Sequence, residues 1–113
     1  MLEKGTRKID VTLVPGANPP VQVDHEVDGD SKIEWKKSSG SADFEILSLD
    51  INATVFTDEE LGPQKRKIKV KDDTAKKGDY EYVLSVKGKE DGKTYTTTKQ
   101  IEDPDGDKPV IRN

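Results

Sequence analysis

Apolar and polar residues alternate along most of this chain with a repeat of two. Apolar or aromatic side chains occupy every second position in segments 9–13, 33–35, 68–70 and 80–86. This repeat is typical of a β-strand with one face buried and the other in water, whereas a helix repeats every ~3.6 residues. Because no segment has a convincing helical repeat, the pattern predicts strands throughout.

Turn-forming residues separate these segments. Pro15-Gly16, Pro19-Pro20, Asp28–Asp30 and Ser38–Ser41 interrupt the first half, and Asp91-Gly92 is a strong hairpin signal. The result is about seven or eight short strands, which two sheets packed face to face would bury. The predicted fold is therefore an all-β, two-sheet antiparallel Greek-key β-sandwich.

Two apolar residues in succession change the inward face of one strand. Phe44 and Ile46 point inward first, followed by Leu47, Leu49 and Ile51. A β-bulge or a kink between sheets explains such a change of parity. We expect all five side chains to face the core.

The remaining segments are assigned from weaker patterns. A strand carries Val21, Val23 and Val27, the segment Asp58–Pro63 is a loop with one helical turn, and a return strand covers Thr94–Ile101. A last edge strand turns Val110 or Ile111 inward. We expect Trp35, Tyr80 and Tyr82 to fill the core, because the chain has few other large side chains.

Composition narrows the classes of protein. Of the 113 residues 30% are hydrophobic and 37% charged, with a net charge of −4. We expect one thin-cored domain over 1–113, with residues 1–6 loose. No apolar run is long enough to span a membrane. The absence of cysteine and the single histidine exclude disulfides, thiol chemistry and most zinc or copper sites.

Two segments resemble strands of known β-sandwich families. Val27–Lys36 (VDGDSKIEWK) resembles the G-D-x-V-x-W strand of cupredoxin-like domains. Lys77–Leu84 (KGDYEYVL) resembles the G-x-Y-x-F/Y-x-C strand of the same group, and also the tyrosine-corner strand of immunoglobulin-like sandwiches. Both resemblances imply a sandwich, and the choice between the two topologies stays open.

The cupredoxin resemblance also implies where copper ligands would stand. The cysteine falls at Leu84, the following histidine near Lys87 and the earlier histidine around Asp43. Copper needs imidazole and thiolate donors, which none of these residues supplies. In an immunoglobulin-like alignment Tyr82 replaces the second cysteine. Either resemblance therefore implies a scaffold without its metal or disulfide.

The last residues carry a third resemblance. Asp107–Asn113 (DKPVIRN) resembles the D-P-x-I-x-N ending of small bacterial sandwich proteins of unknown function, including the DP-EP family. A lysine splits the Asp-Pro pair here, although Asp103-Pro104 stands just upstream. The resemblance implies a final strand and no identifiable chemistry.

Two acidic runs are candidate cation sites. Asp103, Asp105 and Asp107 alternate in a turn and present oxygens that suit Ca²⁺. The plainer interpretation is a solvated turn before the last strand. The other run surrounds His25, which we place at the surface, and we expect its acids on an outer face leading into a loop: Asp24, Glu26, Asp28 and Asp30.

Basic residues concentrate in one stretch, Lys65–Lys71, with Lys76 and Lys77 after it. Alternation with Ile68 and Val70 sends Lys67, Lys69 and Lys71 outward as a stripe. No aromatic residues are interleaved for base stacking and the net charge is negative, so we do not expect nucleic-acid binding. Protection of a sheet edge explains the lysines better.

The chain has no nucleophile and base pair and no phosphate loop, so we do not expect an enzyme. Asn52-Ala53-Thr54 matches a glycosylation sequon, a pattern that often arises by chance. The leading hypothesis is a non-catalytic binding or structural module without metal or cofactor.

Its partner is an unknown protein, or a second copy that pairs along an edge strand, rather than nucleic acid or a membrane. Alternatives are a calcium-stabilised extracytoplasmic module and a small enzyme on the same scaffold. The amino terminus lacks an apolar leader, which leaves cytoplasmic and exported locations open. The loops expected to make contact are Pro15–Pro20, Lys36–Ala42 and Asp58–Gln64.

Overall fold

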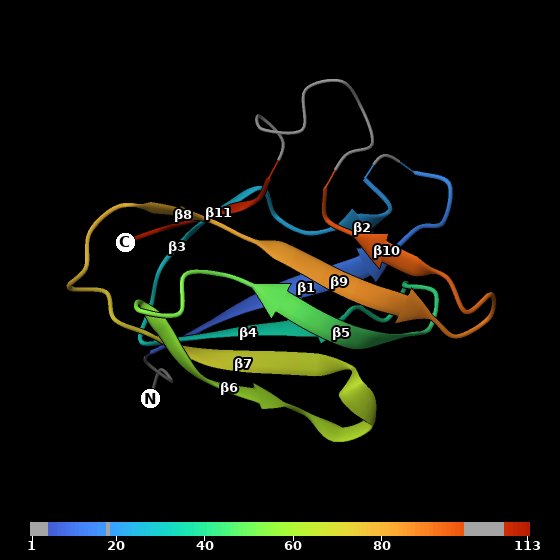
Figure 1. The fold of residues 1–113 in the computed structure, drawn as a ribbon, viewed down its shortest axis with the longest axis horizontal. Helices are drawn as coiled ribbons and strands as arrows, with labels where there is room; N and C mark the ends of the chain where they lie inside the picture. The colour runs from blue at the N-terminus through green and yellow to red at the C-terminus, as the bar shows by residue number, and fades with distance from the viewer. Residues whose placement is uncertain (1–4, 18, 99–107) are drawn as a thin grey trace.

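A computed structural model describes residues 5–17, 19–98 and 108–113 (Figure 1). The described chain consists of short strands with one 3₁₀ turn, η1, and no α-helix. The elements are β1 Thr6–Leu13, β2 Val21–Gln22, β3 Glu26–Asp28, β4 Lys32–Lys37, β5 Phe44–Asp50, β6 Phe56–Leu61, η1 Pro63–Lys65, β7 Lys67–Asp72, β8 Asp79–Glu81, β9 Val83–Gly88, β10 Thr94–Thr96 and β11 Val110–Arg112.

The largest layer is a five-stranded sheet in the order β2-β1-β4-β7-β6. Its strands follow the predicted alternation, since Ile9, Val11 and Leu13 of β1 are buried while Lys8 and Asp10 are exposed. The same alternation holds in β4 and β7. A period of two therefore predicted these strands correctly.

A three-stranded sheet, β10-β9-β5, shares its core with the five-stranded sheet. The predicted bulge is confirmed, because the register between β5 and β9 shifts between Ile46 and Ser48. Leu47 is the extra residue and is 48% exposed. The expectation that Leu47 points inward is wrong, because a bulged residue leaves the ladder and lets Leu49 return to the core.

The third sheet has the order β3-β11-β8. The predicted last strand exists, and Ile111 is its fully buried residue. It is not an edge strand, however, because β3 pairs with it on one side and β8 on the other. The sequence patterns assigned β3 and β8 to other strands, and only the folded chain brings these two segments to β11.

The all-β class is confirmed, and the three sheets are consistent with a β-sandwich. The purely antiparallel, two-sheet arrangement is wrong in detail, because β1 pairs with β4 and β11 with β3 in parallel. Parallel neighbours require long connections, and the chain passes through β2 and β3 between β1 and β4. The 80–86 segment also changes sheets at Tyr82, between β8 and β9.

Several boundaries differ from the predictions. The Val21–Val27 segment forms two separate strands, and the return strand ends at Thr96 within the described residues. The predicted Asp58–Pro63 loop is wrong up to Leu61, which closes strand β6. The helical turn begins later than predicted, because η1 shares only Pro63 with that segment. Only Phe56 of β6 is buried, so this strand has no apolar alternation and is held by backbone pairing with β7.

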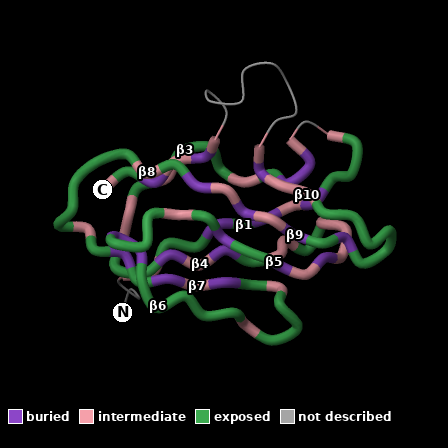
Figure 2. Tube along the Cα trace, in the orientation of Figure 1, coloured by how far each residue is buried: buried purple, intermediate pink, exposed green. Residues whose placement is uncertain are grey.

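One hydrophobic core joins all three sheets (Figure 2). Trp35 and Tyr82 lie at its centre, with ring centroids 5.2 Å apart in an edge-to-face arrangement. Tyr80 is half-buried and packs edge-on against Phe56. The predicted role of these aromatic residues as core filling is confirmed. Among the described residues, no helix is long and apolar enough to cross a membrane.

Candidate functional site

Loops from the five-stranded sheet and from the β10-β9-β5 sheet meet at one end of the molecule (Figure 1). The backbone N–H of Lys37 donates to the carbonyl oxygen of Arg66 at 2.9 Å, and that of Lys89 donates to the carbonyl oxygen of Asp43 at 3.1 Å. These bonds tie the connections after β4, β6 and β9 to one another. We call this region the loop end and define it by three segments: 38–43, 62–66 and 88–93.

The described chain ends lie away from this region. Lys32, at the start of β4, donates its N–H to the carbonyl oxygen of Gly5, whereas Lys37 at the other end of β4 reaches the loop end. Asn113 is hydrogen-bonded to Asp72, the last residue of β7. The loop end is therefore accessible from the side opposite to Gly5 and Asn113.

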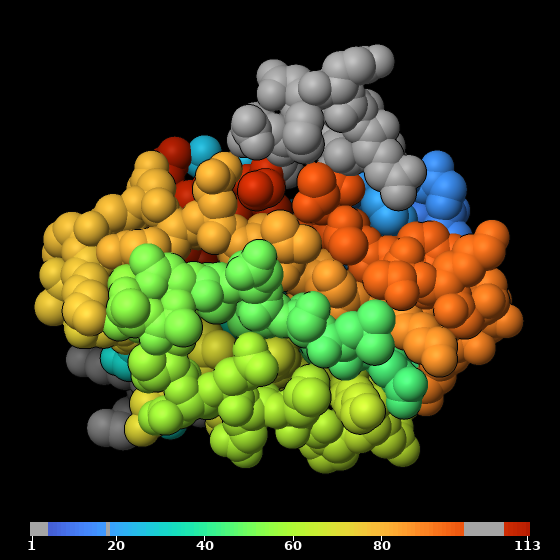
Figure 3. Space-filling model, viewed as in Figure 1, coloured from blue at the N-terminus to red at the C-terminus, as the bar shows by residue number. Residues whose placement is uncertain are grey.

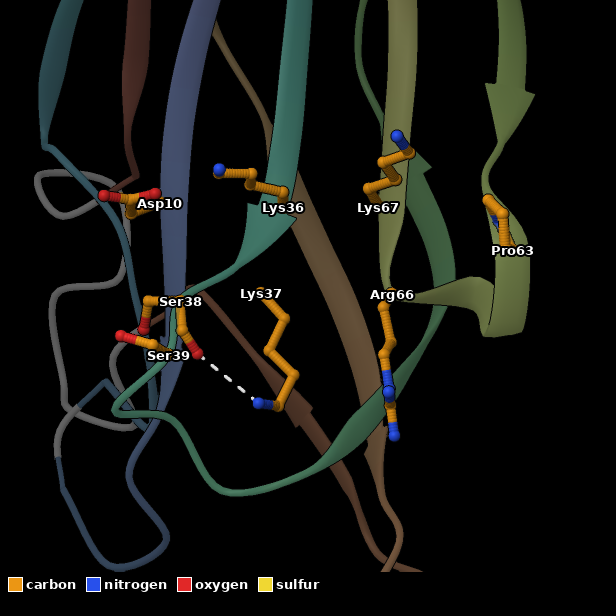
Figure 4. A pocket seen from close by; sticks show the side chains of 8 residues that line it. All are labelled: Asp10, Lys36, Lys37, Ser38, Ser39, Pro63, Arg66 and Lys67. Carbon is orange, nitrogen blue, oxygen red and sulfur yellow. Dashed lines mark hydrogen bonds between the residues drawn. The ribbon is translucent and has the colours of Figure 1, made fainter.

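A depression of about 700 Å³ opens beside the loop end (Figure 4). Four of the side chains that line it are cationic, and one is a carboxylate. Two serines and a proline complete the described lining. The full set is Asp10, Lys36, Lys37, Ser38, Ser39, Pro63, Arg66 and Lys67. We call it the cationic pocket.

Sheet register explains why these side chains gather. Asp10 of β1, Lys36 of β4 and Lys67 of β7 are direct cross-strand neighbours on the outer face of the five-stranded sheet. In Figure 4 the Lys36 side chain extends toward Asp10. Lys37 follows Lys36 on the other face of β4, because successive side chains of a strand alternate, and Arg66 comes from the end of the η1 turn before β7. The pocket thus joins a row of strand residues to the loop beyond it.

An ion pair positions Arg66 within this group. Its Nη2 donates to Asp43 Oδ2 at 2.9 Å, and Lys89 Nζ lies 3.9 Å from the same oxygen. Loss of hydration by itself raises the pKa of the Asp43 carboxyl, but the hydrogen bond and charge of Arg66, with the charge of Lys89, outweigh it and lower the pKa. Arg66 Nε is buried without a partner among the described residues, so the guanidinium keeps an unused donor.

The next row of the same sheet face has a different charge balance. Glu34 is paired across the sheet with Lys8 and Lys69, and Lys69 with Glu60. Acidic and basic side chains therefore alternate in that row. In the row of the cationic pocket, Lys36 and Lys67 face a single acid, Asp10. A second pair of lysines, Lys32 and Lys71, lies at the opposite end of β4, where Lys71 is paired with Asp58 at 3.1 Å.

The three predicted contact loops have different outcomes. Lys36–Ala42 contributes Lys36, Lys37 and both serines to the cationic pocket, whereas Asp58–Gln64 contributes only Pro63. The described residues of Pro15–Pro20 do not line it. Pro19 instead lines a separate depression of about 300 Å³ together with His25, which is exposed as predicted.

The predicted lysine stripe is only partly explained by the sequence. Lys67 and Lys71 are exposed and Lys69 is half-exposed, as expected. Edge protection is the wrong reason, because β7 lies between β4 and β6 inside the sheet. The edge strand next to β7 is β6, which is protected by a bulge at Asp58, where φ is +54°.

The acidic runs form no metal site that the structure describes. Asp24, Glu26 and Asp28 are exposed, and Glu26 Oε1 accepts a hydrogen bond from Arg112 Nη2 at 2.8 Å. Within residues 5–17, 19–98 and 108–113, no three acidic or histidine side chains are grouped to hold a metal ion. The candidate calcium residues lie outside the described residues: Asp103, Asp105 and Asp107.

The three positions at which the cupredoxin resemblance implies copper ligands have different roles in the structure. Leu84 is fully buried in the core, Lys87 is exposed and Asp43 binds Arg66. In the sequon, Asn52 is exposed and its Oδ1 accepts hydrogen bonds from the N–H and hydroxyl of Thr54. None of these residues lines the cationic pocket.

The fold and this pocket define the protein as an all-β domain with a cationic loop end. No protein family matches the chain, and no curated protein sequence matches it. Sequence reasoning missed the pocket, because Lys36 and Arg66 stand 30 positions apart in the chain. The available signal was the Lys36–Ser39 stretch, two lysines followed by two serines where a strand ends.

Proposed function

We propose that this protein is a non-catalytic β-sandwich binding module that holds an acidic segment of a partner protein at its loop end. The observation that carries the proposal is the cationic pocket, where four cations meet one lining carboxylate on a chain whose net charge is −4. A local charge excess opposite in sign to the whole molecule favours a specific anionic partner.

The chemistry of the lining favours carboxylates on a peptide. Lysine and arginine donate charge-assisted hydrogen bonds to carboxylates, and the hydroxyls of Ser38 and Ser39 add neutral donors. Among the described residues no aromatic side chain lines the pocket, so a nucleobase would find no stacking surface there. An acidic protein segment is therefore a better ligand than a nucleic acid.

Two further features support binding rather than catalysis. The described lining has one carboxylate and no histidine, so it holds no acid and base pair of the usual kind. The pairing of β4 with β7 places Lys36 opposite Lys67, which fixes the backbone spacing of the two charged residues before a partner arrives. We extend the proposal to a module that works without metal or cofactor.

A partner protein is favoured over self-association. Two loop ends would repel one another, and the edge strand β6 carries a bulge and the charged run Asp58–Glu60. The likeness to cupredoxin-like or immunoglobulin-like domains is part of the same proposal, since such sandwiches present loops at their ends.

Fluorescence anisotropy with a labelled, glutamate-rich peptide tests the proposal. Neutralising the pocket with Lys36→Gln and Lys67→Gln should weaken binding by about two- to thirtyfold, since each of the two exposed charge pairs contributes roughly 0.2–1 kcal/mol. Affinity for the unchanged protein should fall as salt rises.

Lys32→Gln with Lys77→Gln is the matched control, because Lys32 lies on the same strand as Lys36 but at the opposite end. Equal losses in both double variants would reduce the effect to net charge and reject the pocket. Tighter binding of a single-stranded oligonucleotide than of the peptide would reject an acidic protein segment as the ligand.

A further inference from the structure

A buried acid and amide face each other at the end opposite the loop end. Asp72, at the end of β7, is only 7% exposed. Asn113 follows β11, and its Nδ2 donates to Asp72 Oδ1 at 2.7 Å. The contact joins the end of β7 to the segment after β11, which are 41 positions apart.

The second oxygen of each side chain has no donor. Asp72 Oδ2 and Asn113 Oδ1 are both buried and lack a hydrogen-bond partner among the described residues. Both oxygens lie close to the Cα of Gly29. A Cβ added at this residue would overlap Asn113 Oδ1 and come within 2.6 Å of Asp72 Oδ2. The two unsatisfied acceptors are therefore neighbours, which is unfavourable when both lack a hydrogen.

One proton on the acid satisfies both atoms. A protonated carboxyl has one O–H donor and keeps an acceptor, while a carboxamide has both kinds of group. With the proton on Oδ2, Asp72 donates to Asn113 Oδ1 while Asn113 Nδ2 donates to Asp72 Oδ1. We propose that Asp72 and Asn113 form this closed pair of hydrogen bonds in acid, as a pH-sensitive clamp between β7 and the segment after β11.

The surroundings of the pair favour the protonated acid. Burial raises the pKa of Asp72, and the charges of Asp73 and Asp30 raise it further, whereas the hydrogen bond from Asn113 and the nearby backbone of Asp30 act to lower it. Cations nearby have other partners: Lys71 pairs with Asp58, Arg112 with Glu26, and Lys76 Nζ donates to the Thr54 carbonyl oxygen. Other charged side chains on the adjoining segments are Asp28, Lys77 and Asp79.

The direction of the pH effect follows from linkage. A group whose pKa is higher in the folded state stabilises that state fully below its unfolded pKa, and the gain is lost as pH rises through the folded pKa. Ionised Asp72 would place a carboxylate oxygen against the Asn113 oxygen. The clamp should therefore loosen as the pH rises from about 4.

Carbon-13 NMR of the carboxyl groups tests the clamp directly in the full chain. The Asp72 signal should titrate with a midpoint above 3.8, and the Asp43 signal in the same spectra should titrate below 3.8. An Asp72 midpoint at or below 3.8 would overturn the proposal. This measurement needs no variant and is independent of any binding at the loop end.

A second measurement compares the unfolding equilibrium of the wild type with that of Asp72→Asn between pH 3 and pH 7. An amide at position 72 can form the closed pair at every pH. As the pH rises through the range where Asp72 ionises, the folding equilibrium constant of the wild type should fall relative to that of the variant. The fall should be at most about tenfold per pH unit. Asp73→Asn, an exposed acid one residue away, should keep most of the wild-type profile. Parallel wild-type and Asp72→Asn profiles would contradict the clamp.

Discussion

Gly29 matters because two side chains occupy the space in which a Cβ would stand. The Asp72 and Asn113 oxygens both pack against its Cα hydrogens. Gly29 does not have a positive φ, so the requirement for glycine here comes from close packing and not from backbone conformation. From the sequence, Asp28-Gly29-Asp30 is an ordinary turn. The sequence does not show that oxygens of Asp72 and Asn113 pack against this glycine.

Gly29→Ala should destabilise the protein by about 1–3 kcal/mol, because the added methyl group overlaps the clamp and forces it apart. Chemical denaturation measures the change. Gly40→Ala is the matched control, since no atom beyond its two chain neighbours lies within 4 Å of a Cβ at residue 40. If both variants lose the same stability, packing against Asp72 and Asn113 is not what selects glycine at position 29.

At the scale of the element, β5 shows how one extra residue reassigns a face. Two residues of β5 stand opposite one of β9 at the bulge, so Leu47 turns to solvent while Ile46 and Leu49 both remain buried. The apolar pattern identified the bulge but not which leucine it would expel. That choice depends on the pairing of β9, a strand 33 positions further along.

Truncating the two leucines should separate these environments. Leu49→Ala should cost about 2–5 kcal/mol of stability, as expected for a large side chain removed from a core. Leu47→Ala should change stability by less than about 0.5 kcal/mol, as is usual at an exposed site. Thermal or urea unfolding provides the comparison, and a larger cost for Leu47→Ala would show that the bulge is placed wrongly.

At the scale of the whole molecule, the three sheets depend on one core. Trp35 comes from the five-stranded sheet, Leu84 from the second and Ile111 from the third, and all three belong to a single buried cluster. None of the sheets has a second apolar layer of its own among the described residues. The sheets should therefore unfold together.

The single tryptophan makes this prediction measurable. Trp35 is fully buried, so its fluorescence should report the loss of the core. Unfolding curves followed by tryptophan fluorescence and by far-ultraviolet circular dichroism should coincide within error, as expected for a two-state transition. Separate midpoints would mean that one sheet is stable without the others.

The separation of charge also belongs to the whole molecule. The space-filling view shows the β6–β7 region, the start of β5 and the β9–β10 hairpin side by side toward one end (Figure 3). Lys36 on β4 and Arg66 in the turn before β7 both line the cationic pocket. These two segments are far apart in the chain, but the N–H of Lys37 donates to the carbonyl oxygen of Arg66 and holds them together. Such a pocket is visible only once the register is known.

Alternation in the sequence by itself determined the all-β class, the buried faces of β1, β4 and β7, and the role of Trp35 and Tyr82 in the core. These features follow from local preference, since a period of two buries one face wherever the strand is placed. It also indicated the β5 bulge, because parity cannot change without an extra residue.

Only the tertiary structure decided which strands pair, in which direction and in which register. It made β11 a central strand, placed β6 through its backbone bonds with β7 and its one buried residue, Phe56, and brought Lys36 beside Lys67 and Asp72 beside Asn113. Pairing is a property of two distant segments at once, and so is every site built across it. The local pattern of a strand does not specify which other strand it pairs with, so the pocket and the clamp could be found only in the folded chain.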